Sequence, residues 1–229
     1  MPKRLLPVLI LFLALLAGRA AAETEKVPGK LVFMVQYDMP TADAFNFDEG
    51  FPWLMKELPP ECMVELTYFF KDMIRQAKSA TAGEFPWPVV NPSFLPANPS
   101  TVPYKNLLKF LEENSIQDTT VMFVSNGVSE ELRRTLDSGA FGRGQTAFNP
   151  QRYSPLSKII DYCKSNNVRL LGFYIPAQRG ATRVTQNDIF LEAFRYVVNQ
   201  SGGKAFYNFS SFEGVFKAVL KEETLCAGE

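Results

Sequence analysis

The sequence predicts one doubly wound α/β domain, in which a central, mostly parallel sheet carries helices on both faces. Continuous apolar runs such as Lys30–Gln36 and Thr119–Ser125 are typical of parallel strands that are buried on both faces. Amphipathic helical patterns alternate with these runs along the chain, as they do in βαβ units. The chain has 229 residues, and the part that follows a predicted signal peptide suits a single domain with a full core.

The first 22 residues have the features of a secretory signal peptide. Lys3 and Arg4 form a basic start, Leu5–Leu16 is an apolar run, and Ala20–Ala22 supplies the small residues of a cleavage site. The apolar run is too short to span a bilayer comfortably, which takes about 20 residues. We therefore expect a secreted or periplasmic protein with no membrane span after cleavage. A retained amphipathic anchor is the alternative.

The expected mature chain, residues 23–229, is slightly acidic. Removing the three basic residues of the signal peptide from totals of 24 basic and 24 acidic residues leaves a net charge of about −3, which gives no footprint for nucleic acid. The chain has no His. This excludes the usual general base and every Ser-His or Cys-His catalytic pair.

Strands are predicted where apolar runs are bounded by turn residues. In chain order these are Lys30–Gln36, Cys62–Phe70, Thr119–Ser125, Asn167–Ile175 and Lys204–Phe209. The first four runs are long and apolar enough for buried strands. The last is short and follows a Ser-Gly-Gly turn, which places it after the end of a helix.

Helices are predicted where apolar residues recur at helical spacing between a cap and a stop signal. In chain order these are Phe51–Leu58, Tyr104–Ser115, Val128–Gly139, Ser154–Asn167, Asn187–Gly203 and Ser210–Glu223. Pro103 and Pro155 mark two of the starts, and Ser129 is in position to cap a third. Gly139 and Gly202 mark two of the ends.

The segment Lys71–Val102 is predicted to be a long ordered loop. Six prolines between Pro86 and Pro103 exclude a helix or a central strand there. Phe85, Trp87 and Phe94 lie in the same stretch, and such aromatic side chains are costly to leave in water. Long loops within compact domains are often functional.

The chain has three cysteines, Cys62, Cys163 and Cys226, so an oxidising compartment permits one disulfide and one thiol. Cys163 follows Leu156, Ile159 and Ile160 on an apolar helical face, which indicates a buried thiol. Cys62 and Cys226 are then the candidate pair, and three free thiols are the alternative.

The sequence resembles the von Willebrand factor type A (vWA) family. Its first strand ends in the acidic turn of Leu31–Phe45, and Val121–Ser129 is similar to the family strand that ends in Thr-Asp-Gly. Asn166–Ile175 and Asn199–Glu222 resemble the last two strands, the Gly-Gly turn and the final helix of the family. The resemblance covers about residues 29–222 and implies a vWA/Rossmann-like fold.

The family's metal-ion-dependent adhesion site requires Asp-x-Ser-x-Ser, a Thr and a second Asp. The first motif is replaced by Gln36–Pro40 or, in a register shifted by two, by Asp38–Ala42, and neither keeps both serines. Asn126 stands at the second Asp, and Thr101 matches the Thr. The resemblance therefore implies a degenerate site with no metal. The alternative is an Mg²⁺ bound by Asp38, Thr101 and Asn126.

The resemblance implies a non-enzymatic protein-interaction module of a periplasmic or cell-surface assembly. Its partner edge is expected to contain Asp38, Thr41, Trp87, Phe94, Thr101 and Asn126. The loop Gly83–Pro103 is expected to carry the partner contact, and its alternative role is to cover the sheet edge. Two other functions stay open, namely an Mg²⁺-dependent adhesion module and a secreted hydrolase that uses Asp38. The resemblance also places Cys62 and Cys226 near the opposite end of the sheet, which supports their pairing.

Overall fold

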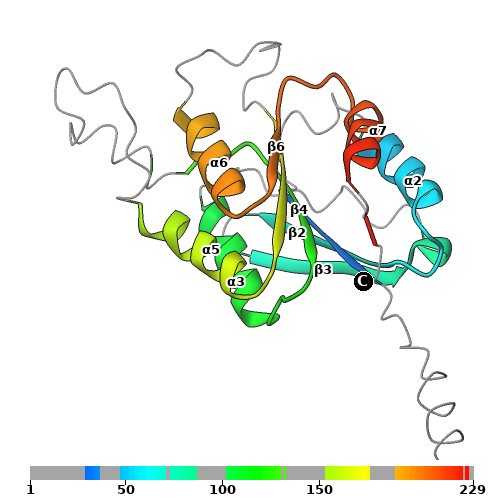
Figure 1. Cartoon of the computed structure of the whole chain (residues 1–229), viewed down its shortest axis with the longest axis horizontal. Helices are drawn as coiled ribbons and strands as arrows, with labels where there is room; N and C mark the ends of the chain where they lie inside the picture. The colour runs from blue at the N-terminus through cyan, green and yellow to red at the C-terminus, as the bar shows by residue number, and fades with distance from the viewer. Residues whose placement is uncertain are drawn as a thin grey trace, which may run out of the picture.

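Six strands form one sheet in the order β3-β2-β1-β4-β5-β6, and helices cover both of its faces (Figure 1). This computed structural model describes residues 29–36, 47–70, 73–86, 102–129, 132, 153–175, 189–223 and 225–226. The architecture confirms the predicted fold class, a doubly wound α/β domain with a mostly parallel sheet. The predicted signal peptide, residues 1–22, lies outside the described residues. Within the described ranges, no helix is long and apolar enough to cross a membrane.

All five predicted strands are present. The strands are β1 (Lys30–Gln36), β2 (Met63–Phe70), β3 (Met73–Thr81), β4 (Thr120–Ser125), β5 (Arg169–Tyr174) and β6 (Lys204–Phe206). Five of them run parallel, and only β3 pairs antiparallel, with β2. The central strands β1 and β4 are buried after their first residue, as their continuous apolar sequences require.

The strand β3 corrects the prediction of a loop over Lys71–Val102. Residues 73–81 of that stretch form an edge strand that is hydrogen-bonded to β2 on one side. An edge strand needs no continuous apolar run, and charged residues such as the exposed Lys78 are typical of sheet edges. The sequence of β3 is therefore too polar to show the apolar run that marks a buried strand.

Five helices lie within the described residues: α2 (Phe47–Glu57), α3 (Pro103–Glu113), α5 (Ser154–Ser165), α6 (Ile189–Gln200) and α7 (Phe212–Glu222). Pro103 and Pro155 stand in the first turns of α3 and α5, where proline does not remove a helical hydrogen bond. Ser211 caps α7 by accepting a hydrogen bond from the Gly214 amide at 3.1 Å. The predicted helix Val128–Gly139 falls mostly outside the described residues.

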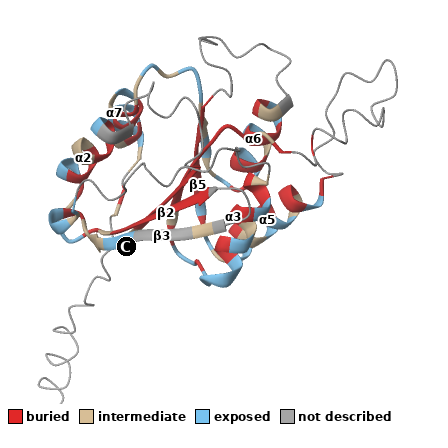
Figure 2. Cartoon of the chain, turned by 180° about the vertical axis from the view of Figure 1, so that it is seen from behind, coloured by how far each residue is buried: buried red, intermediate tan, exposed pale blue. Residues whose placement is uncertain are grey.

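The first core lies between the sheet and the helices α2 and α7, which pack side by side on one face (Figure 1). It is rich in phenylalanine, with fully buried rings from both helices and from two strands: Phe33, Phe51, Phe173, Phe212 and Phe216. Figure 2 shows the buried sides of these helices turned toward the sheet. Phe85, from the predicted partner loop, packs against this core with its ring 5.3 Å from that of Phe51.

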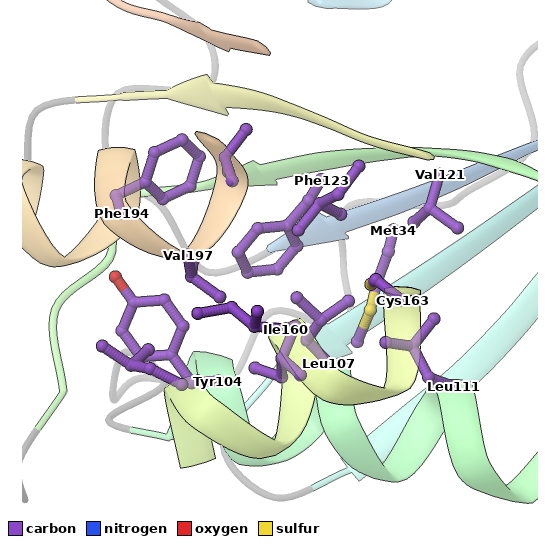
Figure 3. Packing of buried hydrophobic residues seen from close by; sticks show 14 of the residues in the cluster. Met34, Tyr104, Leu107, Leu111, Val121, Phe123, Ile160, Cys163, Phe194 and Val197 are labelled. Atoms are coloured by element: carbon purple, nitrogen blue, oxygen red, sulfur yellow. The ribbon is translucent and has the colours of Figure 1, made fainter. Parts of the chain in front are cut away.

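The second core lies on the opposite face, beneath α3, α5 and α6 (Figure 3). Phe123 of β4 is stacked between two other rings, with centroids 5.8 Å from Phe69 and 5.7 Å from Phe194. Cys163 is a free, buried thiol in this cluster, as predicted, and lies beside Met34 in Figure 3. Because helices pack on both faces of the sheet, the side chains at the ends of its central strands are held in defined positions.

A disulfide joins Cys62 to Cys226, which confirms the predicted pairing. Cys62 precedes β2 and Cys226 follows α7, and their Cα atoms are 5.6 Å apart. Gly29, directly before β1, lies against the same cystine, because a Cβ on Gly29 would be 2.6 Å from the Cα of Cys226. Residues 29 and 226 therefore meet at the edge where the parallel strands begin, which is the edge opposite the predicted partner surface.

Candidate functional site at the carboxyl ends of the strands

The strands β1 and β4 are neighbours at the centre of the sheet, and the chain leaves them toward opposite faces. After β1 it continues to α2 on one face, whereas after β4 it continues to α5 on the other. Such a reversal is the topological switch point of an open α/β sheet, and ligands bind in the crevice outside the carboxyl ends of the strands there. The side chains at the ends of these two strands are therefore the candidate site.

A buried hydrogen-bond network joins the ends of β1 and β4. The side-chain oxygen of Gln36, the last residue of β1, accepts a hydrogen bond from the Ser125 hydroxyl at 2.7 Å. The same oxygen accepts a second hydrogen bond from the Asn126 amide at 3.2 Å. Gln36 and Ser125 are fully buried and Asn126 is 3% exposed. A single amide oxygen thus ties together two strand ends that are 89 residues apart in sequence.

The network continues into the turn that follows β4. The Gly127 amide donates to the Ser125 hydroxyl oxygen at 3.0 Å, and the Val128 amide donates to the Asn126 side-chain oxygen at 3.0 Å. The second bond forms an Asx turn, in which Asn126 supports its own backbone. Gly127 has φ +62°, and a Cβ there would lie 3.1 Å from both the Tyr104 hydroxyl and the Phe190 carbonyl oxygen. Glycine is therefore required at this point of the turn.

Ser129 completes the described part of the edge. Its hydroxyl oxygen accepts a hydrogen bond from the Leu132 amide at 3.4 Å, which is the capping contact predicted for it. The same oxygen lies 2.9 Å from the Tyr153 hydroxyl, and the rings of Tyr153 and Tyr104 pack edge to face. Tyr104 of α3 and Tyr153, the residue before α5, thus pack against the turn that follows β4.

Of the six residues predicted for the partner edge, the structure places Asn126 at the switch point. The other five, Asp38, Thr41, Trp87, Phe94 and Thr101, lie outside the described residues. The sequence placed Gln36 and Ser125 at the carboxyl ends of predicted strands but assigned them no binding role, and it placed Tyr104 only at the start of a predicted helix. The available signal for Gln36 was a polar side chain at the last position of an otherwise apolar strand.

The described side chains at this edge do not fit an Mg²⁺ site. Mg²⁺ prefers six oxygen ligands in octahedral geometry, usually with carboxylate charge. The oxygens of Gln36, Ser125 and Asn126 are neutral, and each already accepts a hydrogen bond from an amide or hydroxyl group. Across the described ranges, no three acidic or Cys side chains lie close enough together to hold a metal.

A hollow lies at the opposite edge, near the disulfide. It is a cleft of about 290 Å³, lined by Glu57, Leu58, Pro59, Leu220, Lys221, Glu222, Glu223 and Leu225. Two of its carboxylates are already paired, Glu222 with Lys204 and Glu223 with Arg169. These ion pairs fasten the end of α7 and the following residues to β5 and β6.

Comparison with solved structures finds a von Willebrand factor type A protein from Catenulispora acidiphila that is similar to this chain, with a TM-score of 0.49 and 10% sequence identity. The match covers 84% of this chain and 42% of the Catenulispora acidiphila chain, so this chain spans less than half the length of that protein. No protein-family model matches the sequence, and no curated protein sequence matches it. The fold assignment therefore rests on the strand order and the two helical layers.

Proposed function

We propose that the chain is a non-enzymatic protein–protein interaction module of a periplasmic, cell-surface or secreted assembly. Its binding surface is the sheet edge at which β1 and β4 end. The observation that carries this proposal is the buried network of Gln36, Ser125 and Asn126 at the switch point. This is the position at which open α/β sheets bind their ligands, and its polar groups are used to hold the backbone in one conformation.

A fixed edge favours recognition because less conformational freedom is lost when a partner binds. The network holds three consecutive amides, at Asn126, Gly127 and Val128, by side chains that are themselves buried. The proposed surface adds the predicted residues Asp38, Thr41, Trp87, Phe94 and Thr101 around this fixed centre. Trp87 and Phe94 are the proposed anchors, because large aromatic side chains dominate many protein interfaces.

The disulfide supports the proposed location outside the cytoplasm. Disulfides persist in secreted and periplasmic proteins and are rare in reducing compartments. The Cys62–Cys226 pair also lies at the edge opposite the proposed surface. A partner that binds at the ends of β1 and β4 therefore does not need to contact the cystine.

Site-specific photo-crosslinking tests which edge binds a partner. A photoreactive amino acid replaces half-buried Val128 at the proposed edge and, as the control, exposed Gln117 just before β4 on the opposite edge. We expect specific protein adducts from position 128 in the extracytoplasmic fraction of the native cells, and none from position 117. Adducts from position 117 alone, or no adducts from either position, contradict the proposed surface.

A Trp87→Ala variant tests the aromatic anchor within that surface. If Trp87 contacts the partner, the variant keeps its melting temperature and loses about 2 kcal/mol or more of binding free energy. If Trp87 covers the sheet edge, unfolding is easier by about 3 kcal/mol. Melting temperature and binding to the crosslinked partner, both measured on this variant, distinguish the two roles.

A further inference from the structure

Gln36 occupies the centre of the switch point, and its chemistry suggests how the binding edge is held. Its side chain is fully buried, and its oxygen receives two hydrogen bonds from the end of β4, from the Ser125 hydroxyl and the Asn126 amide. A buried amide is unfavourable unless its polar atoms are hydrogen-bonded. Separation of the two strand ends would break both contacts together, so this side chain acts as a clasp between β1 and β4.

The contacts that extend outward from Gln36 depend on the position of Ser125. The Ser125 hydroxyl donates its proton to Gln36 and accepts the amide proton of Gly127. Without the Gln36 oxygen, the Ser125 hydroxyl would lose the acceptor that fixes its proton, and only the contact with Gly127 would then orient it. The orientation of the turn after β4 is therefore set from the end of β1.

The direction of these hydrogen bonds is incompatible with a cation at the same point. A cation needs oxygen lone pairs directed toward it, whereas here the protons of Ser125, Asn126 and Gly127 are directed at the oxygens. A metal ion would have to displace these protons and would find no carboxylate charge on the three side chains in exchange. These three side chains therefore offer a metal ion no carboxylate charge, and the lone pairs that the network uses are already occupied.

We infer that Gln36 is a positioning residue, whose side-chain amide holds the turn Asn126–Val128 in its binding conformation without a divalent cation. The use of this turn for binding rests on the proposed function above. The clasp itself can be measured without any partner. The absence of crosslinked partners would contradict the proposed function. Unchanged hydrogen exchange in the Gln36 and Ser125 variants would contradict the role of Gln36.

Residue-resolved hydrogen exchange of the purified protein tests the clasp. Gln36→Met keeps the length of the side chain but removes the oxygen that accepts both hydrogen bonds. Ser125→Ala removes the hydroxyl that links Gln36 to Gly127, and it changes the core less. We expect the Asn126 backbone amide to exchange about tenfold or more faster in Gln36→Met, and the Gly127 amide in Ser125→Ala, because each of these amides loses its buried acceptor. Gly127 should also exchange faster in Gln36→Met, although its own acceptor remains, because Gln36 no longer holds the Ser125 hydroxyl. Amides of the core strand β5 should keep their wild-type rates.

A matched control and a metal series complete the test. Ser201→Ala also deletes a buried hydroxyl, which donates a hydrogen bond to the Val197 carbonyl in α6, and it should leave the rates at Asn126 and Gly127 unchanged. Wild-type rates at these amides should be equal in EDTA, MgCl₂ and MnCl₂. Unchanged rates in both the Gln36 and Ser125 variants would refute the clasp. Slower exchange at these amides, or a higher melting temperature, with Mg²⁺ or Mn²⁺ would refute cation independence.

Discussion

Removal of the Cys62–Cys226 disulfide should lower the stability of the oxidised protein substantially. The two cysteines are separated by 164 residues, so the cystine closes a very long loop in the unfolded chain. In the chain-entropy treatment of cross-links, a loop of this length corresponds to about 5 kcal/mol at 25 °C. For a domain of this size, such a change lowers the melting temperature by roughly 10–20 °C.

Urea unfolding of three variants measures this contribution. Cys62→Ala and Cys226→Ala should each be less stable than wild type by a similar amount, and the double variant should be no less stable than either, because both single changes break the same bond. The m-value should rise in all three variants, since an unfolded chain without the cross-link exposes more surface. Cys163→Ala is the matched control, because it removes a buried thiol that forms no disulfide.

The reasoning is refuted if the single variants unfold at the urea concentration of the wild type. It is also refuted if the two single losses add in the double variant. Additive losses would mean that each cysteine stabilises the fold through its own packing. Reduction of the wild-type protein should reproduce the unfolding curve of the Cys226→Ala variant, which tests the same bond without a substitution.

Two further predictions concern a glycine and a thiol. Gly127→Ala should lower the unfolding free energy by about 2 kcal/mol or more. Gly202 also has a positive φ, but no atom lies within 4 Å of the position that a Cβ would take, so Gly202→Ala should lower it by only about 1 kcal/mol. Equal losses in urea unfolding would contradict the steric argument at Gly127. Burial raises the pKa of Cys163 from 9.0 to about 11, and a side-chain hydrogen bond with Ser201 offsets a part of this rise. Native protein should therefore react slowly with a thiol reagent at pH 8. Because the folded pKa is the higher one, the stability that this thiol confers is present below pH 9 and is lost as the pH rises toward 11. A wild-type unfolding free energy that falls no more steeply than that of Cys163→Ala over this range would contradict the pKa shift.

The sequence predicted best the elements that are buried on both faces. The strand at residues 30–36 was predicted with its observed ends, and the strand that ends at Ser125 differs by one residue at its start. Burial on both faces demands a continuous apolar run, and few other structures produce such a run. The edge strand β3 was missed for the opposite reason, because hydrogen bonding on one side imposes little on its sequence.

The candidate site was less accessible to sequence reasoning. The contact between Gln36 and Ser125 depends on the register of two strands that are far apart in the chain, and a shift of one residue would turn these side chains to opposite faces. The sequence identified polar residues at both strand ends but did not specify that register. Asn126 was assigned to this edge by its place after an apolar strand and by the resemblance of that strand to the Thr-Asp-Gly strand of the vWA family. Both are local signals that need no register.

The contact between Gly29 and Cys226 has a consequence for protein engineering. Residues that meet in space can be joined by a short peptide, and new termini can then be opened in another exposed loop, which gives a circularly permuted protein. The same geometry suits insertion of residues 29–226 as a guest domain into a loop of a host protein, because the two points of attachment lie side by side. In either format the carboxyl ends of β1 and β4 would face away from the junction, so the module could be displayed with that edge exposed.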